Sequence, residues 1–174
     1  MTLGIYGSGG LGREVYELAL SINDKYSKWK EIVFVDDAAD TINSPRDLPV
    51  YTYSELKKHF STENIQFCIA IGEPYFRKKI FDNLINDEMK LATLIHPDVD
   101  IPKSTSIGEG TIICKYVSIT CDISIGQNVY IHPMACIGHD AIIKENSVVS
   151  SFVDIPGECN IGSCTYLAIN VILK

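Results

Sequence analysis

Residues 119–143 read ITCDISIGQNVYIHPMACIGHDAII, and an aliphatic side chain stands at every sixth position of this stretch. The same register runs from residue 101 to residue 173 without an insertion, and its thirteen positions are Ile101, Ile107, Ile113, Ile119, Ile125, Ile131, Ile137, Ile143, Val149, Ile155, Ile161, Leu167 and Leu173. If a quarter of residues are aliphatic, chance gives such a run with odds on the order of 10⁻⁸, whereas fixed-period repeats are typical of β-solenoids.

Each hexad supplies one short strand and one turn, so three hexads close a triangular coil in which the aliphatic residues point inward. Adjacent coils lie one strand spacing apart, ~4.8 Å, and equivalent residues stack in columns. Two adjacent columns are predicted on the coil turns: Cys121, His139 and Gly157 in the first, and Asp122, Asp140 and Glu158 in the second. The repeat predicts a left-handed parallel β-helix over residues 97–174.

The N-terminus has a glycine-rich loop between an apolar run and a helical pattern. Residues 3–7 (LGIYG) lead into Gly7-Ser8-Gly9-Gly10-Leu11-Gly12, and residues 13–19 have helical character. Strand, glycine loop and helix form the context in which backbone amides approach a phosphate. A second strand, residues 31–35, ends in Asp36 and Asp37, where a ribose hydroxyl lies in nucleotide-binding βαβ units.

Further alternation follows: a helix over 53–60, a strand over 66–71 ending at Gly72, a helix over 75–86 and a strand over 90–95. This order predicts a Rossmann-like α/β module over residues 1–96 with a parallel sheet. The module is short for a full dinucleotide fold, so a single nucleotide is favoured over NAD. A glycine loop that only makes a tight turn is the alternative.

Composition excludes several classes of protein. The net charge is -7, with 15 basic and 22 acidic residues and no basic cluster, which disfavours nucleic acid as a partner. No apolar run approaches the ~20 residues of a membrane span, and the N-terminus does not resemble a signal peptide, so we expect a cytoplasmic protein. The six cysteines form no CxxC pair and are interpreted as reduced packing residues, with no metal expected.

The order of motifs resembles a known family. The segments are GSGGLGREV (7–15), VDD (35–37), CIAIGEPYFRKKI (68–80), LIHPDVDIP (94–102) and the hexad segment IGHD (137–140). Together they resemble bacterial sugar O/N-acyltransferases of the sialic acid O-acetyltransferase and bacillosamine N-acetyltransferase type. The resemblance implies transfer of an acetyl group from acetyl-CoA to a sugar, often nucleotide-linked, by a homotrimer with sites between adjacent β-helices, and a role in surface polysaccharide biosynthesis.

The resemblance also implies roles for individual residues. His139 is the expected general base, assisted by Asp140, and the chemistry agrees, because an attacking amine must lose a proton and a neutral imidazole accepts one near pH 7. Thiolate is a good leaving group, so no metal is required. The residues expected at the nucleotide-sugar site are Gly9, Gly10, Leu11, Asp36, Asp37 and Gly72, and those expected along acetyl-CoA are Gly157 and Ile169.

Three features depart from the family pattern. Relatives often have His in place of Leu11, and many have a second His where Val148 stands, so one contact to acetyl-CoA is expected to be lost. Relatives also continue for about two more coils after the segment 167–170, whereas this sequence ends at Lys174. Three interpretations are open: the chain is truncated, the natural protein is short, or a partner covers the end of the β-helix. In each case, part of the acetyl-CoA site of the relatives is expected to be missing from this chain.

Other functions use the same fold. A γ-carbonic-anhydrase-like zinc enzyme needs three histidines, but only His132 and His139 lie in the regular repeat, in different columns. A non-catalytic sugar-nucleotide-binding homologue is favoured by Val148 and the missing coils, and disfavoured by the intact His139–Asp140 pair. Within the enzyme class the glycine loop favours a nucleotide-linked acceptor and hence N-acetylation over O-acetylation. The role of Cys121 beside His139 stays open.

Overall fold

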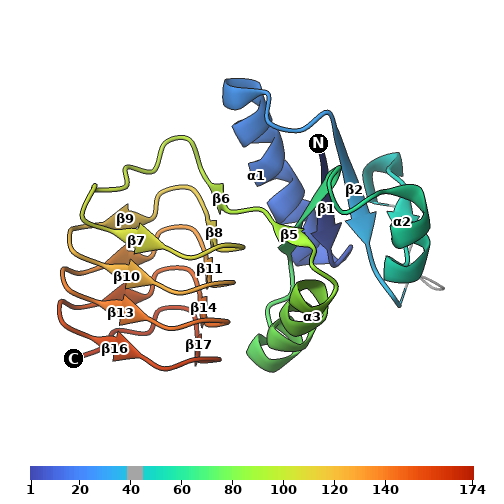
Figure 1. Cartoon of the computed structure of the whole chain (residues 1–174). Coiled ribbons are helices and arrows are strands. Elements are labelled where there is room, and N and C mark those ends of the chain that lie inside the picture. The colour runs from blue at the N-terminus through green and yellow to red at the C-terminus, as the bar shows by residue number, and fades with distance from the viewer. Residues whose placement is uncertain (39–44) are drawn as a thin grey trace.

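The computed structural model describes residues 1–38 and 45–174, and it has an α/β module beside a β-helix (Figure 1). The α/β module has one parallel sheet in the order β3-β2-β1-β4-β5, as a Rossmann-like fold predicts. Its strands are β1 (Thr2–Tyr6), β2 (Glu31–Val35), β3 (Val50–Tyr51), β4 (Ile65–Ile69) and β5 (Lys90–Leu91). Its helices are α1 (Gly10–Tyr26), α2 (Tyr53–His59) and α3 (Pro74–Asn86), with a 3-10 turn at Pro45–Asp47.

Local sequence explains where the helices begin and which face they bury. In α1 the buried side chains Val15, Leu18 and Ile22 recur at helical spacing and face the core. The shorter helix α2 begins with a capping box between Thr52 and Glu55. No helix among the described residues is both long and apolar enough to cross a bilayer.

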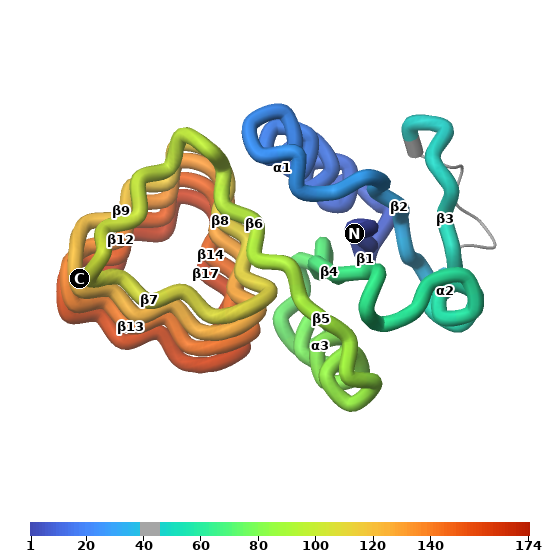
Figure 2. Tube along the Cα trace, turned by 45° about the horizontal axis from the view of Figure 1, so that its top comes forward, coloured from blue at the N-terminus to red at the C-terminus, as the bar shows by residue number. Residues whose placement is uncertain are grey.

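The β-helix strands pair in parallel at intervals of one coil, which confirms the predicted period: Ser124 pairs with Ser106 on one side and Ile142 on the other. Its strands are β6 (Leu94–Ile95), β7 (Ser106–Ile107), β8 (Ile112–Ile113), β9 (Ser118–Ile119), β10 (Ser124–Ile125), β11 (Tyr130–Ile131), β12 (Cys136–Ile137), β13 (Ile142–Ile143), β14 (Val148–Val149), β15 (Asp154–Ile155), β16 (Asn160–Ile161) and β17 (Tyr166–Leu167). Figure 2 shows the triangular cross-section.

Three sheets form the sides of the triangle. The sheet β6-β8-β11-β14-β17 faces the α/β module and is called the module-facing sheet below; the others are β7-β10-β13-β16 and β9-β12-β15. The second residue of each strand points inward, and Ile125, Ile137 and Ile143 are almost completely buried there. Burial of each such side chain stabilises the fold by ~1.5–3 kcal/mol.

The single strand expected over residues 90–95 is instead two strands in different sheets. β5 pairs with β4 of the α/β module, whereas β6 pairs with β8 of the β-helix. Between them the chain crosses from one module to the other, because the Ala92 amide donates to Phe67 O and the Leu94 amide donates to Thr111 O. The β-helix pairing therefore begins just before residue 97.

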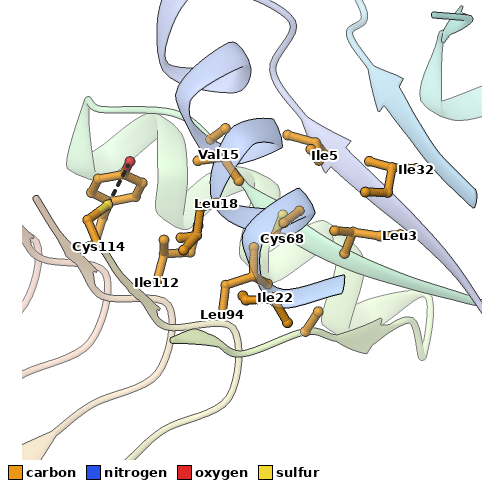
Figure 3. Packing of buried hydrophobic residues seen from close by; sticks show 14 of the residues in the cluster. Leu3, Ile5, Val15, Leu18, Ile22, Ile32, Cys68, Leu94, Ile112 and Cys114 are labelled. Carbon is orange, nitrogen blue, oxygen red and sulfur yellow. Dashed lines mark hydrogen bonds between the residues drawn. The ribbon is translucent and has the colours of Figure 1, made fainter. Parts of the chain in front are cut away.

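The two modules share one apolar core. Leu18 and Ile22 of α1 lie against Leu94 and Ile112, which point outward from the module-facing sheet (Figure 3). Tyr130 and Val148 continue this outward row and are fully buried. The outward row of this sheet is apolar over four coils because the α/β module covers it, and the relative position of the two modules is fixed by packing.

Candidate functional site

His139 and Asp140 lie on the turn between β12 and β13. The His139 Nδ1 is 2.8 Å from Asp140 Oδ2, and both side chains are more than half exposed. This contact assigns the proton of the neutral ring to Nδ1 and leaves the Nε2 lone pair open to a ligand. The hydrogen bond to Asp140 raises the pKa of His139 and outweighs desolvation, which lowers it, and the nearby carboxylates of Glu158 and Asp122 add smaller effects that raise it.

The turns of the neighbouring coils flank the imidazole. A Cβ atom built on Gly157, in the following coil, would lie 2.6 Å from His139 Nε2, so only glycine fits beneath the ring as it stands. In the preceding coil the Cys121 carbonyl accepts from the Asp140 amide at 3.2 Å, and the exposed thiol interacts with Asp122, which raises its pKa. The structure therefore brings together the predicted column, and the Cys121 thiol stays protonated near neutral pH.

The glycine loop contains two kinds of glycine. Gly7 has a φ of 107°, and a side chain on Gly12 would collide with the Gly7 carbonyl, so the fold itself requires both. By contrast, no atom lies within 4 Å of a Cβ built on Gly9, and only an Arg13 nitrogen, at 3.9 Å, approaches one on Gly10. A tight turn therefore explains Gly7 and Gly12 only. Gly9 and Gly10 leave the backbone at the N-terminus of α1 accessible to a ligand.

Asp36 is bound to the glycine loop. Its Oδ2 accepts from the Ser8 amide at 3.0 Å and from the Ser8 hydroxyl at 2.7 Å, and its Oδ1 accepts from the Ala38 amide at 3.0 Å. Desolvation opposes ionisation of this carboxyl group, but the hydrogen bonds outweigh it and lower its pKa. Asp36 is therefore ionised at neutral pH and holds the loop in place.

A cavity of about 440 Å³ opens at the carboxyl edge of the sheet, lined by Tyr6, Gly7, Asp36, Asp37, Ala38, Ile71, Phe76, Lys79, Ile80 and Asn83. Asp37 is held by the Tyr6 hydroxyl and the Tyr53 amide. Helix α3 supplies Phe76, Lys79 and Asn83, which were not predicted from the sequence, although their i, i+3, i+7 spacing places them on one helix face. Lys79 is the only cationic residue among the lining residues.

The remaining predicted residues fall into separate places. Gly72 lies beside Leu11, with 3.7 Å between a Cβ built on Gly72 and the Leu11 side chain, at the same edge as the glycine loop. Gly157 is on the His139 column, whereas Ile169, which is 60% exposed, follows β17 at another corner of the triangle. Val148, where the family pattern has a histidine, is fully buried against the α/β module.

His139 and the glycine loop lie on opposite sides of the β-helix within one chain. The turn that carries His139 is the corner between the sheets β9-β12-β15 and β7-β10-β13-β16, and the α/β module packs on the third sheet (Figure 2). Within residues 1–38 and 45–174, no three His, Cys, Asp or Glu side chains are grouped closely enough to hold a metal ion. The predicted residues thus form one group in the α/β module and one around His139 in the β-helix, and Ile169 lies apart from both.

Comparison with known proteins gives matches in both modules. Residues 2–84 match the family described as the PglD N-terminal domain. The chain is 28% identical over 137 residues to GDP-perosamine N-acetyltransferase of Escherichia coli O157:H7, which covers 73% of this chain and 59% of the relative. It is 30% identical over 112 residues to UDP-N-acetylbacillosamine N-acetyltransferase of Bacillus subtilis (strain 168), which covers 63% of this chain and 49% of the relative. The matches therefore span only about half to three fifths of these curated relatives.

Solved structures share the two-module architecture. WeeI from Acinetobacter baumannii AYE has a TM-score of 0.88 at 22% identity, with 100% of this chain and 81% of that chain covered. The acetyltransferase domain of PglB from Neisseria gonorrhoeae FA1090, in complex with acetyl coenzyme A, has a TM-score of 0.65 at 27% identity, with 98% and 97% covered. The likeness confirms the fold class expected from the sequence.

Proposed function

We propose that this chain, whose residues 2–84 match the PglD N-terminal domain, is a sugar acyltransferase that joins such a domain to hexapeptide repeats and transfers an acetyl group from acetyl-CoA to the amino group of a nucleotide-linked sugar. The two curated relatives are named as N-acetyltransferases of nucleotide-linked sugars, and the gonococcal neighbour binds acetyl-CoA. The further proposal is a cytoplasmic role in making surface polysaccharide, since its six free cysteines suit a reducing compartment.

The observation that carries the proposal is the His139–Asp140 pair. Asp140 occupies Nδ1 at 2.8 Å, so Nε2 is the only ring nitrogen left to accept a proton. In the proposed step the acceptor amine attacks the carbonyl carbon of the acetyl thioester while its proton passes to His139 Nε2. The C–N bond forms, the C–S bond breaks, and CoA leaves as a thiolate that takes up the proton.

The acceptor is proposed to bind at the carboxyl edge of the module sheet. The open backbone at Gly9 and Gly10 can approach a phosphate, where the N-terminus of α1 favours negative charge. The adjoining cavity offers Lys79 for phosphate or ribose oxygens and Phe76, which is 55% exposed, for stacking on a base. Its volume suits one nucleoside rather than a dinucleotide, as the short module suggests.

A complete site then requires a second copy of the chain. Within one chain the β-helix separates His139 from the acceptor cavity, so a nucleotide sugar held there must be acetylated by His139 of a neighbouring copy. We therefore propose a homotrimer with each site between two copies. A head-to-tail contact of this kind closes into a ring when its rotation is threefold.

An exposed apolar stripe supports assembly of the β-helices. Tyr116, Met134 and Phe152 occupy one column at the corner between the module-facing sheet and β9-β12-β15, and they are 61%, 47% and 53% exposed. Each adopts a left-handed φ, of 64°, 65° and 59°. Bulky residues rarely take this conformation, which costs ~1–2 kcal/mol per residue, so contact with another copy would explain their presence.

The test is release of CoA thiol from acetyl-CoA with a panel of UDP- and GDP-linked amino sugars and hydroxy sugars. We expect the wild type to acetylate an amino sugar and His139→Ala to be slower by ~10²–10⁴-fold, the range of a general base. His59→Ala, which removes an exposed histidine of α2, is the matched control and should leave the rate unchanged. No transfer to any member of the panel would refute the proposal, and transfer to hydroxyl groups alone would replace it with O-acetylation.

A further inference from the structure

Arg77 of α3 is fully buried between the two modules and has no carboxylate partner among the described residues. Its Nε donates to Asn128 O of the β-helix at 2.7 Å. Its Nη1 donates to Ile69 O at the end of β4, and it lies 3.3 Å from Ile71 O. One guanidinium thus binds backbone on both sides of the junction.

The surroundings of Arg77 are polar in spite of their burial, and two atoms there, Arg77 Nη2 and Asn128 Oδ1, have no hydrogen-bond partner among the described residues. The guanidinium carbon lies 5.6 Å from the centre of the Tyr130 ring, within the range of a cation–π contact. The Asn128 side chain donates to Asn146 Oδ1 at 2.8 Å and contacts Arg77 O at 3.4 Å. Burial lowers the pKa of Arg77 to about 10, so the group is still charged at neutral pH.

A buried charge without a counter-ion is an expensive way to hold two surfaces together. The apolar junction core already supplies cohesion, through Leu18, Ile22, Leu94 and Ile112. Directed hydrogen bonds add what apolar packing lacks, because they tolerate little sliding of one surface over the other. A rigid fork with donors to both modules suits this task better than a lysine, which is a point charge on a flexible stem.

The position of Arg77 connects the junction to the acceptor cavity. Ile71, whose carbonyl Arg77 contacts, lines that cavity, and Phe76, Lys79 and Asn83 line it from the same helix. We propose that Arg77 is a positioning residue that locks the acceptor cavity onto the β-helix and so sets where the sugar amine is delivered. This inference rests on the proposed acetyl transfer, in which the acceptor cavity and His139 must meet between copies.

The kinetic test compares Arg77→Met and Arg77→Lys with Lys78→Met. Lys78 is exposed on the same helix and forms an ion pair with Asp82, so its variant controls for changes in α3. We expect kcat to fall by ~10–100-fold in Arg77→Met, because displacement of about 1 Å has effects of this size, with KM for acetyl-CoA unchanged. Arg77→Lys keeps the charge without the fork and should show a smaller fall in kcat. Rates equal to the Lys78→Met control in a folded Arg77→Lys protein would overturn the proposal.

A second pair of measurements does not depend on activity, and the first of them uses the wild type alone. In the wild type, the backbone amides around Arg77, in β4, α3 and the Asn128 turn, should exchange with solvent slowly. Their exchange rates should be as low as those of amides in the β-helix core. Calorimetry of the wild type should give one unfolding transition, and Arg77→Met or Arg77→Lys should separate it into two or broaden it. Fast exchange of the junction in the wild type would refute the lock even if acetyl transfer is observed. Slow exchange without acetyl transfer would instead refute the proposed function alone.

Discussion

Replacement of Gly157 with alanine is expected to displace the His139 imidazole while leaving the β-helix intact. The new Cβ would lie 2.6 Å from Nε2, 2.7 Å from Cε1 and 3.0 Å from Cδ2 of the ring, and the closest of these contacts must lengthen. Gly157 does not have a left-handed φ, so alanine introduces no backbone strain. His139 is more than half exposed, and its ring can swing towards solvent.

The size of the effect follows from these distances. An ordinary contact begins at 3.4 Å, so Nε2 must move by about 0.8 Å relative to its present position. A displacement of about 1 Å at a reacting group costs up to ~10²-fold in rate, so we expect kcat/KM to fall by ~10–100-fold, or ~1.4–2.7 kcal/mol in activation free energy. The free energy of unfolding should change by no more than ~0.5 kcal/mol, as for most surface substitutions.

The assay is a double-mutant cycle on CoA thiol release with Gly157→Ala, His139→Ala and the double variant. If alanine acts through the imidazole, Gly157→Ala should have little further effect once His139 is removed. Gly162→Ala is the matched control, because its nearest neighbour, Thr165 Oγ1, is 3.6 Å from the built Cβ.

Two results would refute the reasoning. The first is an unchanged rate in Gly157→Ala, which would mean that the position of the imidazole does not matter. The second is full additivity with His139→Ala, which would mean that the substitution acts elsewhere, for example on acetyl-CoA itself. A rise in KM for acetyl-CoA without a change in kcat would identify that second case.

Three further predictions test other parts of the site. Asp140→Asn removes the negative charge of the hydrogen-bond acceptor that raises the pKa of His139, so the acidic limb of the kcat/KM–pH profile, where the base becomes protonated, should move to lower pH; an unmoved limb would argue against the pair. Asp36→Ala should raise KM for the nucleotide sugar but not for acetyl-CoA in steady-state kinetics, because the Ser8 contacts that hold the glycine loop are lost. Phe152→Asn should stabilise each chain by ~1 kcal/mol, since Asn tolerates left-handed backbone, yet weaken the trimer in sedimentation analysis; unchanged association would exclude this residue from the interface.

The β-helix and its columns were predictable from sequence because the interactions that form it repeat at a fixed interval. Each inward residue contacts its counterparts one coil away, so the period alone places Gly157 beneath His139. The parallel α/β module was likewise predictable, apart from the short strand β3 and the division of residues 90–95. Residues 90–95 form two strands because β5 pairs with β4 of the α/β module, whereas β6 pairs with β8 of the β-helix.

The arrangement of the modules was not visible in the sequence. Arg77 reads as one of several charges in an amphipathic helix, yet it is fully buried because α3 packs against the Asn128 turn. Lys79 and Asn83 likewise became cavity residues only through the placement of α3 beside β1 and β2.

Sequence periodicity therefore specified the coil, the core register and the neighbours of His139, since these depend on contacts between adjacent coils. Tertiary structure alone decided that the α/β module covers the module-facing sheet, and hence that the glycine loop and His139 lie on opposite sides of the β-helix. That outcome depends on the fit of two apolar surfaces far apart in the chain, and no local pattern encodes their relative orientation.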